Sequence, residues 1–189
     1  MANGCEVVKR HKDFVKNLIK ISSDTGRELS FSICVKDGQE SGYTSVGEEL
    51  FVEVPPCPKD MKFVGSVHTH GNIDFFSSID YYVFANGSED FMCVAYEEGG
   101  KHYVRCIHRP KDTNRWLWKV AEVSSREAEV RDLFNDYQEA VNDFISRANS
   151  EEEKILEKMR DLKKRLRQKM DELRKASRDA EYDACVLEL

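Results

Sequence analysis

The sequence lacks any apolar run long enough to cross a membrane. Its hydrophobic stretches are far shorter than the roughly 18 to 20 residues that a spanning helix needs. The polar start MANGCEVVKRHKDF also lacks the hydrophobic segment of a signal peptide. We therefore expect a soluble protein of the cytoplasm.

None of the six cysteines belongs to a CxxC pair, so the sequence contains neither a zinc ribbon nor a thioredoxin-like redox motif. Cys34, Cys93 and Cys106 lie within apolar, strand-like stretches, where a buried thiol usually serves as a small hydrophobic side chain. We expect these cysteines to be free thiols, and the protein to reside in a reducing compartment.

Two common zinc-enzyme motifs are absent as well. A nucleobase deaminase needs HxE and PCxxC, but the stretch PPCPKD has no second cysteine two residues on. The HExxH motif of many metalloproteases does not occur either. A chain of 189 residues with 40% hydrophobic side chains can nevertheless bury one proper core and a smaller appendage. Its net charge of -6 combines segments of opposite sign and says little about partners.

The first part of the chain alternates between strand and helix patterns, which indicates an α/β fold. Apolar residues at helical spacing predict a single amphipathic helix over Val8–Ile21. Strands are predicted at Glu28–Val35, Glu49–Val54 and Lys62–His70, a helix at Ser77–Phe84, and a hairpin from FMCVAY and KHYVRCI around EEGG. This globular part ends near Pro110, so we divide the chain into domains at 1–112 and 113–189.

The second part contains no proline or glycine beyond Arg115, and its apolar residues follow heptads. Two phases occur, one through Phe134, Tyr137, Val141, Phe144 and Ala148, the other through Ile155, Met159, Leu162 and Leu166. Between them, Ser150 and Glu153 resemble a capping box, which predicts two long helices with a break near Asn149.

These two helices differ in charge. Glu122–Asp143 carries seven acidic and two basic residues, whereas Lys154–Asp179 carries eleven basic and five acidic ones. The opposite charges favour pairing, either as a hairpin within one chain or as a homo- or heterodimer. A solvated basic helix face is an equally good interpretation of the second segment, and binding of nucleic acid or acidic lipid is less favoured.

The stretch VHTHGNIDFFSSID contains the candidate site. Taken separately, SSID fits an ordinary helix cap by Ser77 and Asp80, and HTH fits two histidines on one face of a strand. Together, two imidazoles at the end of a strand and a carboxylate in the first turn of the next helix fit a catalytic zinc site with an open fourth position. We predict that His68, His70 and Asp80 bind Zn²⁺ and that Ser77 offers a hydroxyl to a developing oxyanion. Asp74, in the intervening loop, is the less favoured alternative ligand.

The pattern HxH followed by SxxD resembles that of the JAMM, or MPN-plus, zinc metalloproteases, which include the deubiquitinating subunits of the proteasome lid and the signalosome. Glu28, on a strand after the first helix, is similar in position to the glutamate that acts as general base in this family, and Glu48 and Glu49 are its rivals. The resemblance covers roughly Val7–Arg109. In this chain Gly71 stands where the family usually has proline, and the loop before Ser77 is about one residue shorter than in many members.

The resemblance implies an MPN-type fold, a mixed β-sheet flanked by helices and related to cytidine deaminases, with a C-terminal long-helix or coiled-coil extension. It implies an isopeptidase that removes ubiquitin or a ubiquitin-like protein from substrates, and the proteasome as a possible assembly partner. Residues Lys36–Asp60 would supply a sheet edge and a flap for the modifier's extended tail. The alternative is a non-catalytic scaffold of the same fold that assembles with partners through its C-terminal helices.

Overall fold

The computed structural model describes residues 1–49, 52–146 and 151–189, and the chain divides into two compact units. Met1–Thr113 and Glu181–Leu189 form the first unit, which we call the sheet domain. Asn114–Ala180 form the second, which we call the helical hairpin. The expected division differs at its far end, because residues 181–189 belong to the sheet domain and not to the helical extension.

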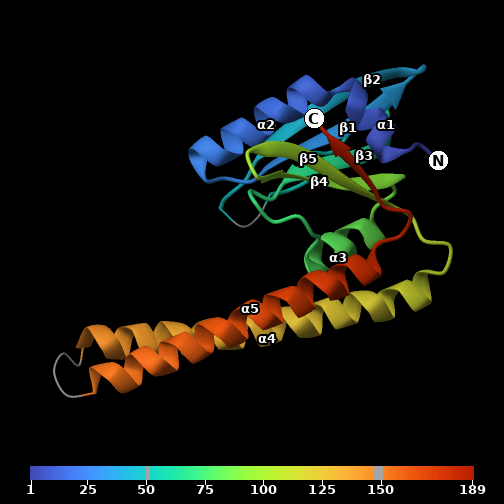
Figure 1. Ribbon diagram of the computed structural model, residues 1–189. Helices are drawn as coiled ribbons and strands as arrows, with labels where there is room; N and C mark the ends of the chain where they lie inside the picture. Colours follow the sequence, from blue (N-terminus) through green and yellow to red (C-terminus); the bar gives the residue numbers. More distant parts are fainter. Residues whose placement is uncertain (50–51, 147–150) are drawn as a thin grey trace. The chain divides into compact units, whose positions relative to one another are not determined.

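The sheet domain contains a six-stranded mixed sheet in the order β2-β1-β3-β4-β5-β6 (Figure 1). The strands are β1 Leu29–Lys36, β2 Gln39–Val46, β3 Lys62–Thr69, β4 Phe91–Glu98, β5 Lys101–His108 and β6 Cys185–Glu188. Strands β3 and β4 run parallel, and every other neighbouring pair is antiparallel. The expected mixed α/β architecture is therefore confirmed at this level.

The N-terminal segment forms two helices where one was predicted: α1 Gly4–Arg10 and α2 Lys12–Thr25. The break falls at His11, whose backbone leaves the helical region at φ -112° and ψ 16°. Its ring is held outside the helix by Glu40 on β2, with 2.8 Å between Nε2 and Oε2. Apolar periodicity continues across this break, which is why the sequence pattern did not reveal it.

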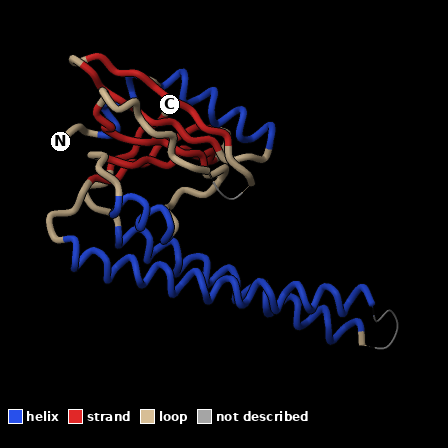
Figure 2. Tube along the Cα trace, turned by 180° about the vertical axis from the view of Figure 1, so that it is seen from behind, coloured by secondary structure: helices blue, strands red, loops and turns tan. Residues whose placement is uncertain are grey.

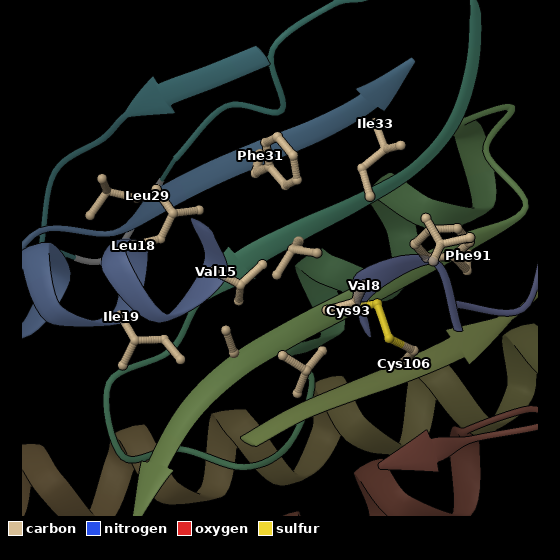
Figure 3. Packing of buried hydrophobic residues seen from close by; sticks show 14 of the residues in the cluster. Val8, Val15, Leu18, Ile19, Leu29, Phe31, Ile33, Phe91, Cys93 and Cys106 are labelled. Atoms are coloured by element: carbon tan, nitrogen blue, oxygen red, sulfur yellow. A yellow bond between two sulfur atoms is a disulfide. The ribbon is translucent and has the colours of Figure 1, made fainter. Parts of the chain in front are cut away.

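The hydrophobic core lies between α2 and one face of the sheet (Figure 3). Val15, Leu18 and Ile19 of α2 pack with Leu29 and Phe31 of β1, and all five side chains are buried. The third helix, α3 Ser78–Asn86, lies on the other side of the sheet in both Figure 1 and Figure 2. The helix Ser77–Phe84 and the β4–β5 hairpin were both predicted, and Gly99 and Gly100 take the expected positive φ.

The predicted strand Glu49–Val54 is wrong where the structure describes it. Val52–Val54 form no strand, and residues 50 and 51 lie outside the described part of the chain. The edge strand is instead β2, which follows a two-residue turn at Asp37 and Gly38, both with positive φ as hairpin turns of this type require. Its sequence QESGYTSV has little apolar character, and none of its residues is buried.

The expectation of free thiols is also wrong. All six cysteines form disulfides, pairing Cys5 with Cys185, Cys34 with Cys57 and Cys93 with Cys106. The buried cysteines have covalent partners on neighbouring segments that no spacing in the sequence could indicate. Disulfides are typical of oxidising compartments, and also of intracellular proteins from hyperthermophiles. The expectation of a reducing compartment therefore loses its basis.

The C-terminal residues form a strand that sequence analysis missed. Strand β6 is only four residues long and pairs with β5, and Cys185 links it to α1. A buried histidine, His108, supports the same junction, because its Nε2 accepts from the Gly4 N–H at 2.9 Å and its Nδ1 donates to the Asp183 carbonyl at 2.6 Å. The two ends of the chain are thus tied to one edge of the sheet.

The helical hairpin consists of α4 Thr113–Ser146 and α5 Glu152–Ala180 (Figure 2). The two helices are antiparallel within one chain, as shown by ion pairs from Arg126 to Glu172 (3.1 Å) and from Lys169 to Glu129 (2.8 Å). Of the two pairings considered, the structure contains the intrachain one. The predicted break at Asn149 and the cap by Ser150 lie outside the described residues.

The apolar seam of the hairpin differs from the predicted one on α4. Leu133, Ala140 and Leu162 form its buried centre, and Tyr137, Met159 and Leu166 pack against them. Phe134, which was assigned to the seam, is 48% exposed. The buried residues Leu133 and Ala140 each lie one residue before the predicted Phe134 and Val141, so the predicted phase is shifted by one residue. The small side chain of Ala140 permits close approach of the two helices at its position.

Among the described residues, no helix combines the length and the apolar character needed to span a lipid bilayer.

Candidate metal centre

His68 near the end of β3 and His70 directly after it lie on the side of the sheet that faces α3. Successive side chains of a strand point to opposite faces. Val67 belongs to the core against α2, and the Thr69 hydroxyl contacts Ser22 of α2. His68 and His70 therefore point the other way, as the sequence predicted for the two ends of the HxH motif.

The first turn of α3 brings a carboxylate to these histidines. Ser77 is the N-cap, and with Asp80 it forms the predicted capping box. The Asp80 Oδ2 atom accepts from the Ser77 backbone N–H at 2.7 Å and from the Ser77 hydroxyl at 2.8 Å, while the Asp80 N–H donates to Ser77 Oγ at 3.2 Å. The cap fixes the side chain of Asp80 without using its second oxygen, Oδ1.

The three predicted ligands meet in space. His68 Nε2 lies 2.9 Å from His70 Nε2 and 3.0 Å from Asp80 Oδ1, and His70 Nε2 lies 3.3 Å from Asp80 Oδ2. For zinc bonds of about 2.0 to 2.2 Å, tetrahedral ligand atoms are roughly 3.3 to 3.5 Å apart. The observed group is therefore slightly contracted relative to a loaded site. Two imidazoles and one carboxylate can hold a divalent metal ion here.

Hydrogen bonding prepares His70 as a ligand. Its Nδ1 atom lies 3.0 Å from the Phe75 carbonyl oxygen and donates to it, so Nε2 is the ring nitrogen that can give up its proton to Asp80 or to solvent and bind a metal. Burial alone lowers the pKa of His70, but the carboxylates of Asp80 and Glu28 and the Phe75 carbonyl raise it overall. The ring is thus oriented by a backbone carbonyl, as metal-bound histidines commonly are.

The same histidines control the ionisation of Asp80. Burial alone would raise the pKa of this carboxyl group, but its charge interactions and hydrogen bonds with His68 and His70 hold the pKa well below the usual range. Asp80 is consequently a carboxylate at neutral pH, which is the form that binds a metal.

Glu28, immediately before β1, lines the same pocket as the three ligands. Burial raises its pKa, His70 and His68 oppose that shift, and Asp80 adds to it, so the pKa lies above the ordinary value. Its backbone is held on both sides, by Glu28 N–H to Glu48 O at 2.9 Å and Gly47 N–H to Glu28 O at 2.8 Å. The rivals Glu48 and Glu49 are exposed and do not line the pocket.

The walls of the pocket were not predicted. Apolar side chains from four segments form them: Val52, Val54, Ile73, Phe75, Ile79, Val83 and Met92. Two of them, Ile79 and Val83, are one helical turn apart on α3 and remain 61% and 44% exposed. In the sequence, the only indication of this apolar wall would have been the two aliphatic residues four positions apart beside the SxxD motif.

Three further side-chain groups near or resembling a ligand set do not contribute a metal ligand. Ser77 lines the pocket, but its hydroxyl donates to Asp80. Asp74 is buried and is not part of the ligand group. Cys5, Cys106 and Cys185 also cluster within 4.8 Å, but their sulfurs are engaged in disulfides and so are not thiolate ligands.

No family model matches the chain, and comparisons with curated proteins and with solved structures returned no match.

Proposed function

We propose that the protein is a zinc-dependent peptidase or isopeptidase of the JAMM type. One observation carries the proposal: a single pocket is lined by four residues from three separate segments, Glu28, His68, His70 and Asp80. The potential ligand atoms of the last three lie within 4.8 Å of one another. Two imidazoles and one carboxylate form a ligand set used by catalytic zinc sites, which keep a fourth position open. Zinc bound there would supply a Lewis acid that polarises a carbonyl group and makes water a stronger acid.

Glu28 is the general base in this proposal. Its carboxylate takes a proton from the attacking water and later passes it to the nitrogen of the leaving amine. Burial holds the pKa of Glu28 above the ordinary value of a glutamate, which makes its carboxylate a stronger base than an exposed one.

Ser77 supports the reaction at a second point. Its hydroxyl lies on the pocket wall, and on turning away from Asp80 Oδ2 it can donate a hydrogen bond to the oxygen that becomes negatively charged as the amide is attacked. Asp80 keeps its hydrogen bond from the Ser77 backbone N–H during this exchange.

The substrate in the proposal is the C-terminal tail of ubiquitin or of a ubiquitin-like protein, joined to another protein. The similarity of the HxH and SxxD motifs to the JAMM pattern supports this assignment. Strand β2 lies at the edge of the sheet, and its free edge can pair with an extended peptide. Apolar side chains such as Val54 and Ile79 offer contacts for the tail beside the ligand group.

The test is cleavage of a linear fusion of ubiquitin or a ubiquitin-like protein by the zinc-loaded wild type, by Glu28→Gln and by Glu48→Gln. We expect Glu28→Gln to lower kcat by about 10²- to 10⁴-fold with zinc content unchanged. Glu48→Gln, a neighbouring glutamate outside the pocket, should behave as wild type. A zinc-loaded wild type that cleaves none of these fusions would overturn the proposal.

The second candidate, a scaffold that binds partners through its helices, is favoured by one observation. Phe134 and Ile145 on α4 are 48% and 73% exposed, and at eleven residues, or three helical turns, apart they share one face of the helix. Such residues fit contacts with a second copy or with an assembly such as the proteasome. Failure of the wild type to bind zinc, together with a loss of oligomer formation in Phe134→Glu, would support this candidate instead.

A further inference from the structure

We infer that Thr69, the central residue of the HTH motif, is a positioning residue that sets Glu28 relative to the metal ligands. This inference rests on the proposed function, in which Glu28 is the base. Thr69 touches neither the pocket nor the ligand atoms, because its side chain points to the opposite face of β3. It acts through a hydrogen bond to the backbone beside Glu28.

The sheet divides at the position of Thr69. Backbone pairing between β1 and β3 ends at Ser30 and His68. Beyond that pair, β3 stays with β4, through the Thr69–Ala95 pair and the His70 N–H bond to the Ala95 carbonyl at 2.9 Å. The start of β1, in contrast, stays with β2 on its other side. Glu28, just before β1, and His70, just after β3, therefore lie where the two strands separate, and both line the pocket.

Thr69 bridges this division with its side chain. The Leu29 N–H, which no longer meets a carbonyl of β3, donates to Thr69 Oγ1 at 2.9 Å. The Thr69 hydroxyl donates in turn to Ser22 Oγ at 2.9 Å, and the Ser22 hydroxyl donates to the Arg27 carbonyl at 2.7 Å. Thr69 and Ser22 are both buried, so these donors and acceptors have little access to water.

The chain of hydrogen bonds fixes three successive residues. Arg27 is held at its carbonyl by Ser22, Glu28 at both backbone groups by residues 47–48, and Leu29 at its N–H by Thr69. Since β3 contains His68 and is followed directly by His70, Thr69 couples the residue after Glu28 to the segment that carries two of the ligands. Loss of the hydroxyl would leave the Leu29 N–H buried without a partner and let the start of β1 move.

Movement of the start of β1 would displace Glu28 and lower the catalytic rate. A displacement of a catalytic group by about 1 Å can cost roughly 100-fold in rate even when substrate binding is retained. We therefore expect Thr69→Val, which keeps the shape and removes the hydroxyl, to lower kcat by about 10- to 100-fold. The Michaelis constant and the zinc affinity should remain within about threefold of wild type, because neither the pocket walls nor the ligands change.

The experiment compares Thr69→Val, Thr69→Ser and Thr44→Val in the full, zinc-loaded chain. Thr69→Ser retains the hydroxyl and should rescue kcat, and Thr44→Val, on the exposed edge strand β2, is the matched control. Amide hydrogen exchange gives a readout independent of activity: the Leu29 amide should lose protection in Thr69→Val and keep it in the other two.

Ser22→Ala completes a double-mutant cycle. If the two hydroxyls act as one unit, Thr69→Val combined with Ser22→Ala should be no slower than Thr69→Val alone. Equal kcat in wild type and Thr69→Val would overturn the inference while leaving the proposed function intact. So would a Thr69→Val enzyme that loses zinc, or one that serine fails to rescue. A zinc-loaded wild type without cleavage activity would instead remove the proposed function, and the inference with it.

Discussion

His68 and Asp80 face each other with 3.0 Å between Nε2 and Oδ1, although His68 lies near the end of a strand and Asp80 in the first turn of a helix. The loop between them carries Phe75, whose carbonyl orients His70, and Ser77, whose cap orients Asp80. The residues that form the loop thus also arrange the ligands, so a short stretch of sequence builds most of the candidate metal centre.

The first prediction concerns Asp80. Replacing it with Asn keeps the size of the side chain but removes the negative charge that a divalent ion requires, so the purified protein should lose stoichiometric zinc. Elemental analysis of the freshly purified protein measures this directly. Asp74→Asn, a buried carboxylate in the adjacent loop, is the matched control and should retain zinc. If Asp80→Asn retained as much zinc as wild type, Asp80 would not be a ligand.

The second prediction concerns Glu40, which holds β2 to the junction of α1 and α2. The hydrogen bond from Arg10 lowers the pKa of Glu40 most, burial opposes it, and His11 lowers it further. Since the folded pKa lies below the unfolded one, this stabilisation is complete above the unfolded value of 4.5 and is lost as pH falls through the folded pKa. Glu40→Gln should therefore cost about 1 kcal/mol at pH 7.

Urea denaturation at several pH values measures this difference. The free energies of unfolding of wild type and Glu40→Gln should converge as the pH is lowered below 4.5. A difference that stayed constant down to the acid limit would show that the charge of Glu40 is not its cause.

The third prediction concerns the disulfides. Under non-reducing, denaturing conditions the chain should have no reactive thiol, and its mass should be lower by two hydrogens for each of the three bonds. Cys5–Cys185 spans 180 residues and Cys34–Cys57 spans 23, so loop-closure entropy predicts a larger loss from opening the first, by about 2 kcal/mol. Double serine variants of each pair, compared by chemical denaturation, test this order.

The fourth prediction concerns the helical hairpin. Replacing residues 114–180 by a flexible glycine and serine linker should leave the sheet domain folded and able to bind zinc, because β6 and Cys185 remain. Truncation after Thr113 removes them as well and should lower the melting temperature further. Circular dichroism and zinc content measure both outcomes. Equal loss of structure in the two variants would mean that the hairpin is needed for folding of the sheet domain.

Much of the site could be predicted because its signals are local. The alternation of a strand places His68 and His70 on one face, and the capping pattern of Ser77 and Asp80 starts α3 at a defined residue. Both rules act over a few residues. Glu28 required the resemblance to a family, because no local rule relates it to a histidine forty residues later in the chain.

The features that were missed depend on partners distant in sequence. In the sequence the buried cysteines look like small hydrophobic residues, because only the fold shows that Cys93 lies opposite Cys106 on the neighbouring strand. Strand β6 acquires its structure from β5 and from Cys5, and nothing in CVLE predicts either contact. The seam of the hairpin is set by both helices together, so the preference of α4 alone placed Phe134 in it wrongly.

The assignment of His68, His70 and Asp80 as metal ligands is tested most directly by an anomalous difference map, calculated from crystals of the zinc-loaded protein at the zinc absorption edge. A single peak about 2.0 to 2.2 Å from His68 Nε2, His70 Nε2 and an Asp80 carboxylate oxygen is the predicted result. Absence of a peak between these three side chains in zinc-loaded crystals would contradict it.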